Sequence, residues 1–404
     1  MFWQRPIEHA LDRLRQHVRA PLKLVLWDGR EIDLDDEPRV TLRLTDARTA
    51  AALARPSLLA LAEAYIEGGA EVEGDLREAI RSAEALSRTV GAATFDRRGR
   101  AGVRRSQGAD REAIRHHYDV SNAFYALWLD PLMVYSCAYF RTWADSLEQA
   151  QVAKLDHICT KLRLAPGERF LDVGCGWGAL VMHAASRYGV QATGITLSEN
   201  QHRLANERIR AAGLEGRCRV LLQHYRDHRG EACYDKVASV GMFEHVGLAH
   251  LPEYFGAVRR LLRDRGLFLN HGITSSDVQN RAVGLGGGEF IDRYVFPKGE
   301  LPHLHRVVHD MSEQGFEVHD VECLRPHYVR TLEHWSANYE RRLREAAAEA
   351  GERTARIWRL YLAGSAHAFE QGWISIHQVL GSRMERPGRA ELPITREWMY
   401  RGKG

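Results

Sequence analysis

The sequence predicts an α/β protein whose main domain is a doubly wound, mostly parallel sheet. Three observations support this fold class. Short apolar runs alternate with segments in which apolar residues recur at helical intervals over most of the chain. One of these runs ends in an acidic residue followed by glycines at alternate positions, and polar residues follow most of the runs. Such alternation is typical of βαβ units, in which helices connect parallel strands.

Seven runs are strand candidates. They cover residues 168–173, 191–196, 217–222, 234–240, 266–271, 316–323 and 374–381. Helical spacing fills residues 179–188, 199–212 and 251–263, and a longer helical insertion covers about 328–371. We therefore expect a Rossmann-like, seven-stranded sheet with helical insertions.

A smaller α+β domain is expected over residues 1–95. The chain begins with helical spacing, continues with short β-like runs at 22–27 and 40–44, and returns to helical spacing from Ser57. Residues 96–111 are rich in arginine and glycine and lack an apolar pattern, which predicts a basic linker. The main, catalytic domain is then expected over residues 112–404.

Composition restricts the partners and the compartment. A chain of 404 residues predicts about two domains, and a net charge of +3 predicts no general affinity for nucleic acid. The six cysteines form no C-x-x-C pair, and no apolar leader follows the start, as expected in a reducing cytoplasm. No window reaches the roughly 20 apolar residues of a membrane span, so any membrane contact is expected to be peripheral.

The glycine loop after the first strand of the sheet predicts a cofactor site. Glycine at positions 174, 176 and 178 lets bare backbone approach a ligand, and the next helix directs its first amides toward it. A dinucleotide site would place the third glycine one residue later and an acid at the end of the next strand. The strand at 191–196 ends without a carboxylate, which favours S-adenosylmethionine (SAM) over NAD. The alternative is an ordinary tight turn.

Polar residues collect where the predicted strands end. Parallel sheets bind ligands at the carboxyl ends of their strands, so these residues are expected to share one edge. They are Asp172, Thr196, Ser198, Tyr225, Arg226, Glu244, His245 and His271.

Six segments, taken together, resemble the cyclopropane fatty acid synthase family, which includes the mycolic acid cyclopropane synthases. The segments are His117–Asn122, Tyr135–Tyr139, Leu171–Gly178, Gly194–Ser198, Gly241–Gly247 and Phe290–Pro297. The resemblance implies a class I methyltransferase sheet. It also implies transfer of a methyl group from SAM to a cis double bond of an acyl chain, leaving a carbocation that loses a proton and closes a ring.

The resemblance further implies a bound bicarbonate that acts as the base. Its expected ligands are Cys137, Glu244, His271, Ile273 through its backbone, and Tyr361. A thiol, a hydroxyl, an imidazole and an amide can hold an anion by donating hydrogen bonds, while Glu244 shares a proton or orients His271. Taken singly, a cysteine in an apolar stretch is more often part of the core.

The cofactor residues follow from the same resemblance. Gly174, Gly176 and Gly178 approach the methionine part, and Tyr135 and Ser136 cover it. The remaining expected contacts are Asp172, Thr196, Leu197, Ser198, Gln201, Tyr225 and Arg226. Four aromatic residues, Phe124, Trp128, Tyr139 and Phe243, either surround the carbocation or belong to the core. No metal is expected, because His116 and His117 lack a third ligand at metal-site spacing.

The substrate is expected to be an unsaturated acyl chain of a membrane phospholipid. Delivery of the chain by a carrier protein is the alternative. Arginines of the linker favour an anionic membrane surface, namely Arg97, Arg98, Arg100, Arg104 and Arg105. We expect a cytoplasmic protein that contacts the inner face of the membrane peripherally, with a homodimer left open. A methyl-branched, methylene or hydroxylated product, or a lipid-binding protein with a vestigial site, are the rival hypotheses.

Overall fold

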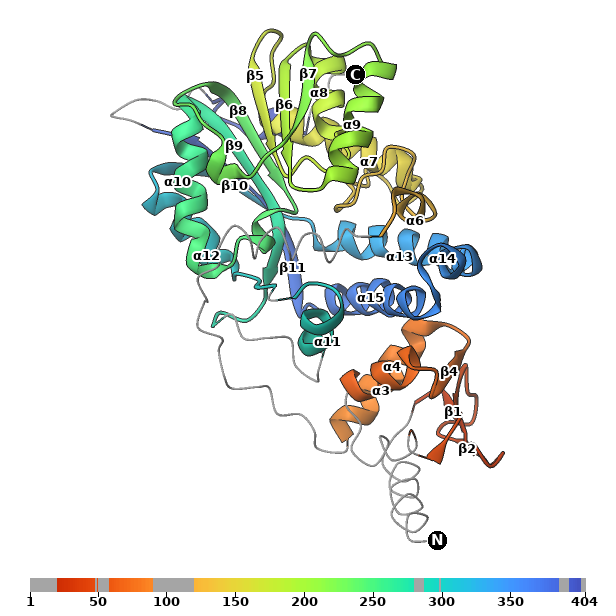
Figure 1. Cartoon of the computed structure of the whole chain (residues 1–404). Helices are drawn as coiled ribbons and strands as arrows, with labels where there is room; N and C mark the ends of the chain where they lie inside the picture. The colour runs from red at the N-terminus through yellow and green to blue at the C-terminus, as the bar shows by residue number, and fades with distance from the viewer. Residues whose placement is uncertain are drawn as a thin grey trace. The chain divides into compact units, whose positions relative to one another are not determined.

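The computed structural model of the chain describes two compact units (Figure 1). The described residues are 20–47, 49, 58–89, 120–279, 287–297, 299–384 and 392–400. The predicted N-terminal helix, the linker 96–111 with its arginines, and His116 and His117 lie outside these ranges. The larger unit comprises 100–280, 299–334 and 374–404, and the smaller comprises 1–99, 281–298 and 335–373.

A seven-stranded sheet forms the centre of the larger unit, in the order β10-β11-β9-β8-β5-β6-β7. The strands are β5 (Arg169–Val173), β6 (Gln191–Thr196), β7 (Cys218–Leu222), β8 (Tyr234–Val240), β9 (Leu262–Ser275), β10 (Phe316–Cys323) and β11 (Ile374–Arg383). Strands β5 to β9 pair in parallel, whereas β11 pairs antiparallel with both β9 and β10. The seven predicted strands and the mostly parallel sheet are confirmed, and β9 is longer than expected at both ends.

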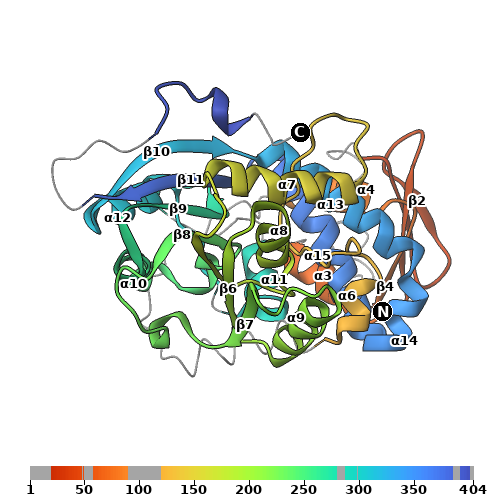
Figure 2. The same cartoon turned by 90° about the horizontal axis from the view of Figure 1, so that it is seen from above.

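Helices cover both faces of this sheet (Figures 1 and 2). One face carries α7 (Leu147–Lys161), α8 (Ala179–Tyr188) and α9 (Glu199–Ala211), and the other carries α10 (Leu251–Leu261) and α12 (Leu304–Glu313). Successive strand residues point to opposite faces. On β5, Phe170 packs with residues of α7 and α8, whereas Leu171 and Val173 pack with residues of α10 and α12. An apolar core therefore packs against each face of the sheet.

The shorter elements of the larger unit lie in its connections. They are α6 (Asn122–Ala126), η1 (Tyr225–Asp227), η2 (Phe243–His245), η3 (Leu248–His250) and η4 (Glu397–Met399). Strand β5 lies between β6 and β8, so the chain passes from β5 to β6 on one side and returns from β7 to β8 on the other side of β5. Ligands bind at such a switch point, at the carboxyl ends of the strands. The fold therefore directs attention to the loops after β5, β6 and β8.

The smaller unit contains helices and a four-stranded sheet with the strand order β2-β1-β3-β4. Its strands are β1 (Leu22–Val25), β2 (Glu31–Asp33), β3 (Val40–Leu44) and β4 (Ala70–Glu73). Its helices are α3 (Leu58–Ile66), α4 (Leu76–Thr89), α11 (Gly287–Tyr294), α14 (Leu343–Ala350) and α15 (Glu352–Glu370), and α13 (Arg325–Arg341) is divided between the two units. An α+β arrangement was expected for the N-terminal region and is observed.

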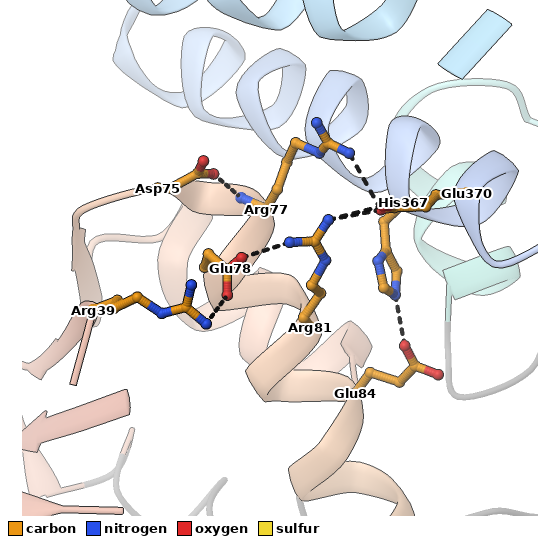
Figure 3. Close-up of polar contacts among 8 residues, drawn as sticks. All are labelled: Arg39, Asp75, Arg77, Glu78, Arg81, Glu84, His367 and Glu370. Atoms are coloured by element: carbon orange, nitrogen blue, oxygen red, sulfur yellow. Dashed lines mark hydrogen bonds and ion pairs between the residues drawn. The ribbon is translucent and has the colours of Figure 1, made fainter. Parts of the chain in front are cut away.

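Polar contacts tie α4 to α15 within this unit (Figure 3). Arg77 and Arg81 both donate to the Glu370 carboxylate, at 3.2 and 2.9 Å. One turn away, His367 and Glu84 form a buried hydrogen bond of 2.6 Å between Nε2 and Oε2. Segments almost 300 residues apart thus share one unit, and the units divide the chain differently from the linear boundaries at 95 and 111.

Among the described residues, no helix is long and apolar enough to cross a bilayer.

Candidate functional site

A cavity opens at the carboxyl ends of β5, β6 and β8 in the larger unit. Nine of the expected cofactor residues line it: Tyr135, Ser136, Asp172, Gly174, Gly176, Thr196, Leu197, Gln201 and Tyr225. Three others, Gly178, Ser198 and Arg226, do not. A cavity therefore lies at the sheet edge predicted from the strand ends, and four of the eight polar residues predicted there line it, namely Asp172, Thr196, Tyr225 and His245.

The glycine loop has the backbone that the sequence predicts. Gly174 has φ +81°, and a Cβ at this position would lie 2.8 Å from Met242 Cγ. Gly176 also has a positive φ, +54°. Both conformations favour glycine. Gly178 serves another purpose: it precedes α8 with φ +83°, and a Cβ there would lie 3.1 Å from Ala205 Cβ on α9. It therefore lets two helices pack closely and does not contact the cavity.

The loop after β6 is organised by its own side chains. Thr196 Oγ1 donates to Gln201 Oε1 at 2.8 Å, and both residues line the cavity. Ser198 caps α9, because its Oγ accepts from the Gln201 amide at 3.3 Å. The Ser198 hydroxyl thus fixes the start of the helix. Thr196 and Gln201 remain as the polar groups that a ligand at this end would meet.

Beyond β7, the two neighbours Tyr225 and Arg226 separate. Tyr225 is buried and lines the cavity. The Arg226 guanidinium forms an ion pair with Glu253 at 2.8 Å and lies 5.4 Å from the centre of the Tyr225 ring. Arg226 therefore supports Tyr225 from outside the cavity.

Glu244 lies against β9 because the short helix that contains it, η2, packs closely on this strand. The Phe243 ring in η2 lies on Gly272, where an added Cβ would come within 1.8 Å of Phe243 Cε1. This packing brings Glu244 Oε1 within 2.7 Å of the Ile273 amide, which donates to it. The second oxygen, Oε2, is buried and has no hydrogen-bond partner among the described residues. Burial raises the pKa of Glu244 to about 7, so the carboxyl can gain or lose a proton near neutrality.

His271 lies two residues before Ile273 on β9 and is fully buried. Its Nδ1 is 3.3 Å from Gln378 Nε2, and an amide nitrogen that donates to Nδ1 requires the ring proton to be on Nε2. Burial, followed by the charges of Lys154 and Lys161, holds the pKa of His271 well below its usual range. The ring is therefore neutral, and its Nε2–H has no partner among the described residues.

Cys137 and Tyr361 complete the expected set, in different units. Cys137 is fully buried, and burial raises the pKa of its thiol. Its Sγ contacts the carbonyl oxygens of Ala138 at 3.2 Å and Leu324 at 3.8 Å. Tyr361 belongs to the smaller unit, on α15. The structure thus brings Glu244, His271 and Ile273 together at η2 and β9.

The four aromatic residues differ in their surroundings. Phe124 and Trp128 are fully buried, each within 6 Å of the Tyr125 ring. Tyr139 stacks between His157 at 4.2 Å and His327 at 4.7 Å. Phe243 packs on Gly272, as described above. None of the four lines the cavity described here.

Sequence reasoning missed several residues of the cavity, above all Lys154. This lysine is 2% exposed, lines the cavity and donates from Nζ to Ser136 Oγ at 2.8 Å. Lys161 follows seven residues later on the same buried face of α7. A lysine within the apolar stripe of a helix is the signal that could have found it. Trp177 and Met242, both within the family segments, also line the cavity.

Comparison with known proteins agrees with this geometry. The family described as mycolic acid cyclopropane synthetase matches residues 105–379, and a domain of unknown function matches residues 11–91. A probable fatty acid methyltransferase of Pseudomonas putida is 50% identical over 96% of this chain and 98% of its own length. A cyclopropane-fatty-acyl-phospholipid synthase of Escherichia coli K12 is 40% identical over 67% of each chain.

A solved structure extends the likeness to three dimensions. A mycolic acid cyclopropane synthase crystallised with S-adenosylhomocysteine (SAH) and CTAB matches with a TM-score of 0.64 at 35% identity. The match covers 68% of this chain and 98% of that one. The sheet, the cavity at its switch point and these relatives lead to one conclusion: the chain belongs to the mycolic acid cyclopropane synthetase family.

Proposed function

We propose that this protein transfers the methyl carbon of SAM to a cis double bond of an unsaturated phospholipid acyl chain and closes a cyclopropane ring. The observation that carries the proposal is the pair of buried atoms, Glu244 Oε2 and His271 Nε2, that lack a partner among the described residues. They lie on η2 and β9, at the edge that also bears the glycine-lined cavity. Methyl transfer followed by loss of a proton requires both a cofactor site and groups that manage a proton.

The cavity residues fit SAM. Positive φ angles at Gly174 and Gly176 leave backbone where a side chain would block a ligand. Asp172 Oδ1 is buried with no hydrogen-bond partner among the described residues, so a donor on a ligand would satisfy it. Bound SAM would supply an activated methyl group, and the chain's own residues would orient it and exclude water. SAM use is further supported by the SAH-bound relative.

We further propose that a bicarbonate ion is held beside Glu244 and His271, where it would supply the base. Neutral His271 offers its Nε2–H, and Cys137, kept as a thiol by burial, is a second weak donor. Protonated Glu244 can donate from Oε2. The Ile273 amide is bonded to Glu244 Oε1, so this expected backbone donor would reach an anion only after that carboxyl moves. Tyr361 is proposed as the hydroxyl donor.

Two alternatives start from the same site. The Pseudomonas putida relative is named a probable fatty acid methyltransferase, a name that is compatible with a methyl-branched or methylene product. The name of the Escherichia coli relative specifies a cyclopropane on a phospholipid. We choose the ring product because the residues proposed to bind the anion are all present, and a phospholipid substrate because the linker arginines favour a membrane lipid. A lipid-binding protein with a vestigial site is disfavoured by the glycine loop and by the partnerless atoms of Glu244 and His271.

Incubation of the purified full chain with SAM and vesicles of a cis-monounsaturated phospholipid tests the proposal. NMR of the extracted acyl chains distinguishes a ring from a branch or a methylene group, and vesicles of saturated phospholipid serve as the control. We expect ring protons only with the unsaturated lipid, and about tenfold slower formation by Tyr361→Phe. Absence of any modified chain would contradict the enzyme assignment, and a branched product would favour the alternative.

The proposed substrate also implies where the protein acts. Acyl chains of phospholipids lie in the bilayer, so we propose a cytoplasmic protein that contacts the inner face of the membrane peripherally. The linker arginines support this through their charge. A homodimer remains a prediction, which sedimentation velocity of the purified chain would test.

A further inference from the structure

An exposed cysteine lies beside a histidine at the edge of the seven-stranded sheet. Cys323 ends the edge strand β10, directly opposite His377 of β11 in the antiparallel pair. Side chains at opposite positions are neighbours on one face of a sheet, and here the imidazole forms a hydrogen bond with the thiol. Cys323 is exposed, and neither residue lines the cavity described above. The pair is therefore separate from the chemistry of the proposed function.

The imidazole is fixed by the next strand of the sheet. His377 Nδ1 lies 3.0 Å from the hydroxyl oxygen of Thr274 on β9, and Thr274 is only 2% exposed. A hydrogen bond to a buried hydroxyl holds the ring in one orientation. A thiol, an imidazole and a hydroxyl thus follow one another across β10, β11 and β9, which are adjacent in the sheet.

The surroundings of the sulfur favour its ionised form. It has hydrogen bonds with His377, with Ser375, whose Oγ lies 3.4 Å from Sγ, and with the backbone amide of Arg325. Arg325 is the first residue of α13, so this amide belongs to the positive end of a 17-residue helix. These hydrogen bonds, above all the one with His377, lower the pKa of Cys323 to about 6 against the effect of burial. The thiolate therefore predominates at neutral pH.

The other five cysteines have different surroundings. Cys233 is partly exposed, and four are buried, namely Cys137, Cys159, Cys175 and Cys218. Burial raises the pKa of all five thiols. A thiolate, and not a thiol, is the nucleophile, so exposure and ionisation coincide at Cys323 alone. A metal site is disfavoured, because the described residues contain no group of three or more His, Cys, Asp and Glu side chains that could hold an ion.

We propose that Cys323, supported by His377, is a modification site for hydroperoxides. The thiolate sulfur attacks one peroxide oxygen, and the S–O bond forms as the O–O bond breaks. The sulfur is oxidised by two electrons to a sulfenic acid, and the peroxide is reduced. The leaving hydroxide or alkoxide takes up a proton from the solvent. Thiolate character and exposure, which both distinguish Cys323, are the properties that make a cysteine susceptible to this step.

Trapping with dimedone, which reacts with sulfenic acids, tests the proposal in the full parent chain. The protein is treated with hydrogen peroxide and dimedone near pH 7, and its tryptic peptides are measured by mass spectrometry over time. We expect the peptide that contains Cys323 to be labelled about tenfold faster than the peptide that contains Cys233. Both cysteines belong to the same molecule, so this comparison requires no variant. Labelling of Cys323 no faster than that of Cys233 overturns the proposal.

Two histidine variants then test the part played by His377. His377→Gln removes the imidazole and should slow the labelling of Cys323 about fivefold or more. His319→Gln is the matched control, because His319 lies on the same strand as Cys323 but bonds Ser382 Oγ at 2.7 Å. The control should keep the parent rate. Parent-rate labelling in His377→Gln, or an equal loss in both variants, overturns the assignment to His377. No SAM or lipid is present, so these results do not depend on the proposed function.

Discussion

At the scale of single residues, Glu244 shows how burial creates a functional group. Its Oε1 is fixed by the Ile273 amide, while Oε2 has no partner in the described part of the chain. The resulting pKa of about 7 means that the folded protein favours the protonated carboxyl over a pH range in which an exposed glutamate is charged. Above that pH the buried carboxylate lowers the stability of the folded protein, and near that pH the carboxyl can transfer a proton.

Glu244→Gln should therefore be more stable and less active than the parent chain at pH 8. The folded-state pKa is raised, so the stability that protonation contributes is complete below the unfolded value of about 4.5 and is lost as the pH rises through about 7. Glutamine keeps the acceptor for Ile273 without the charge. We expect a gain of roughly 1–3 kcal/mol in the free energy of unfolding in urea at pH 8. Turnover should fall about tenfold or more, with SAH affinity little changed.

The stability difference supplies its own control. At pH 4 the parent carboxyl is protonated in the folded state and largely so in the unfolded state, so the difference between the two proteins should shrink. A variant less stable than the parent chain at pH 8, or one with normal turnover, would contradict the role given to Glu244.

At the scale of elements, close approaches at glycine decide where the functional groups lie. Gly272 admits the Phe243 ring, and that contact sets η2 against β9. Gly174 similarly admits Met242 beside the loop after β5. These glycines interrupt apolar or motif segments in the sequence, yet the neighbour that each one accommodates becomes visible only in the fold.

Gly272→Ala tests the first contact. The new Cβ would overlap Phe243, so η2 must move and the bond between Glu244 and Ile273 should be lost. We expect a loss of roughly 1–3 kcal/mol in the free energy of unfolding, measured in urea, together with slower turnover. Gly216→Ala is the matched control, because its Cβ would meet nothing within 4 Å. Equal behaviour of the two variants would show that the contact is dispensable.

Gly174→Val tests the second contact and the cofactor assignment. A branched residue is strained at φ +81° and would meet Met242, and it would also occupy the loop that lines the cavity. We expect SAH binding in calorimetry to be lost while circular dichroism still reports a folded α/β protein. Near-normal SAH affinity would place the cofactor elsewhere.

At the scale of the whole molecule, sequence predicts the features that depend on local patterns of residues. The seven strands were found because apolar runs and helical spacing alternate, and the cavity edge because polar residues follow the strands. Ser198 and Arg226 share that pattern, but the structure uses them for a helix cap and an ion pair with Glu253. Lys154 was missed because a lysine in a helix is usually exposed.

The composition of the two units depends on contacts that no local pattern contains. Arg81 reaches Glu370 across 289 residues of chain, and α15 therefore belongs with α4 in the smaller unit (Figure 3). The sequence prediction included this helix in the catalytic domain, residues 112–404, as a helical insertion and through the family resemblance at Tyr361. Long-range ion pairs and the buried contact between Glu84 and His367 are features that only the folded chain displays.

Binding to membranes is a property of the whole chain, and the linker arginines provide its test. Each arginine near an anionic surface contributes about 1 kcal/mol, so their joint replacement by glutamine at 97, 98, 100, 104 and 105 should weaken binding strongly. Sedimentation with vesicles should show that the parent chain requires anionic lipid and detaches as salt rises beyond about 0.15 M, where the Debye length is about 8 Å.

The variant should lose vesicle binding and activity on phospholipid while keeping its SAH affinity. Equal sedimentation of the parent chain with neutral and anionic vesicles, or full activity of the variant, would remove the linker from membrane recognition and favour either residues 1–95 or delivery of the acyl chain by a carrier protein.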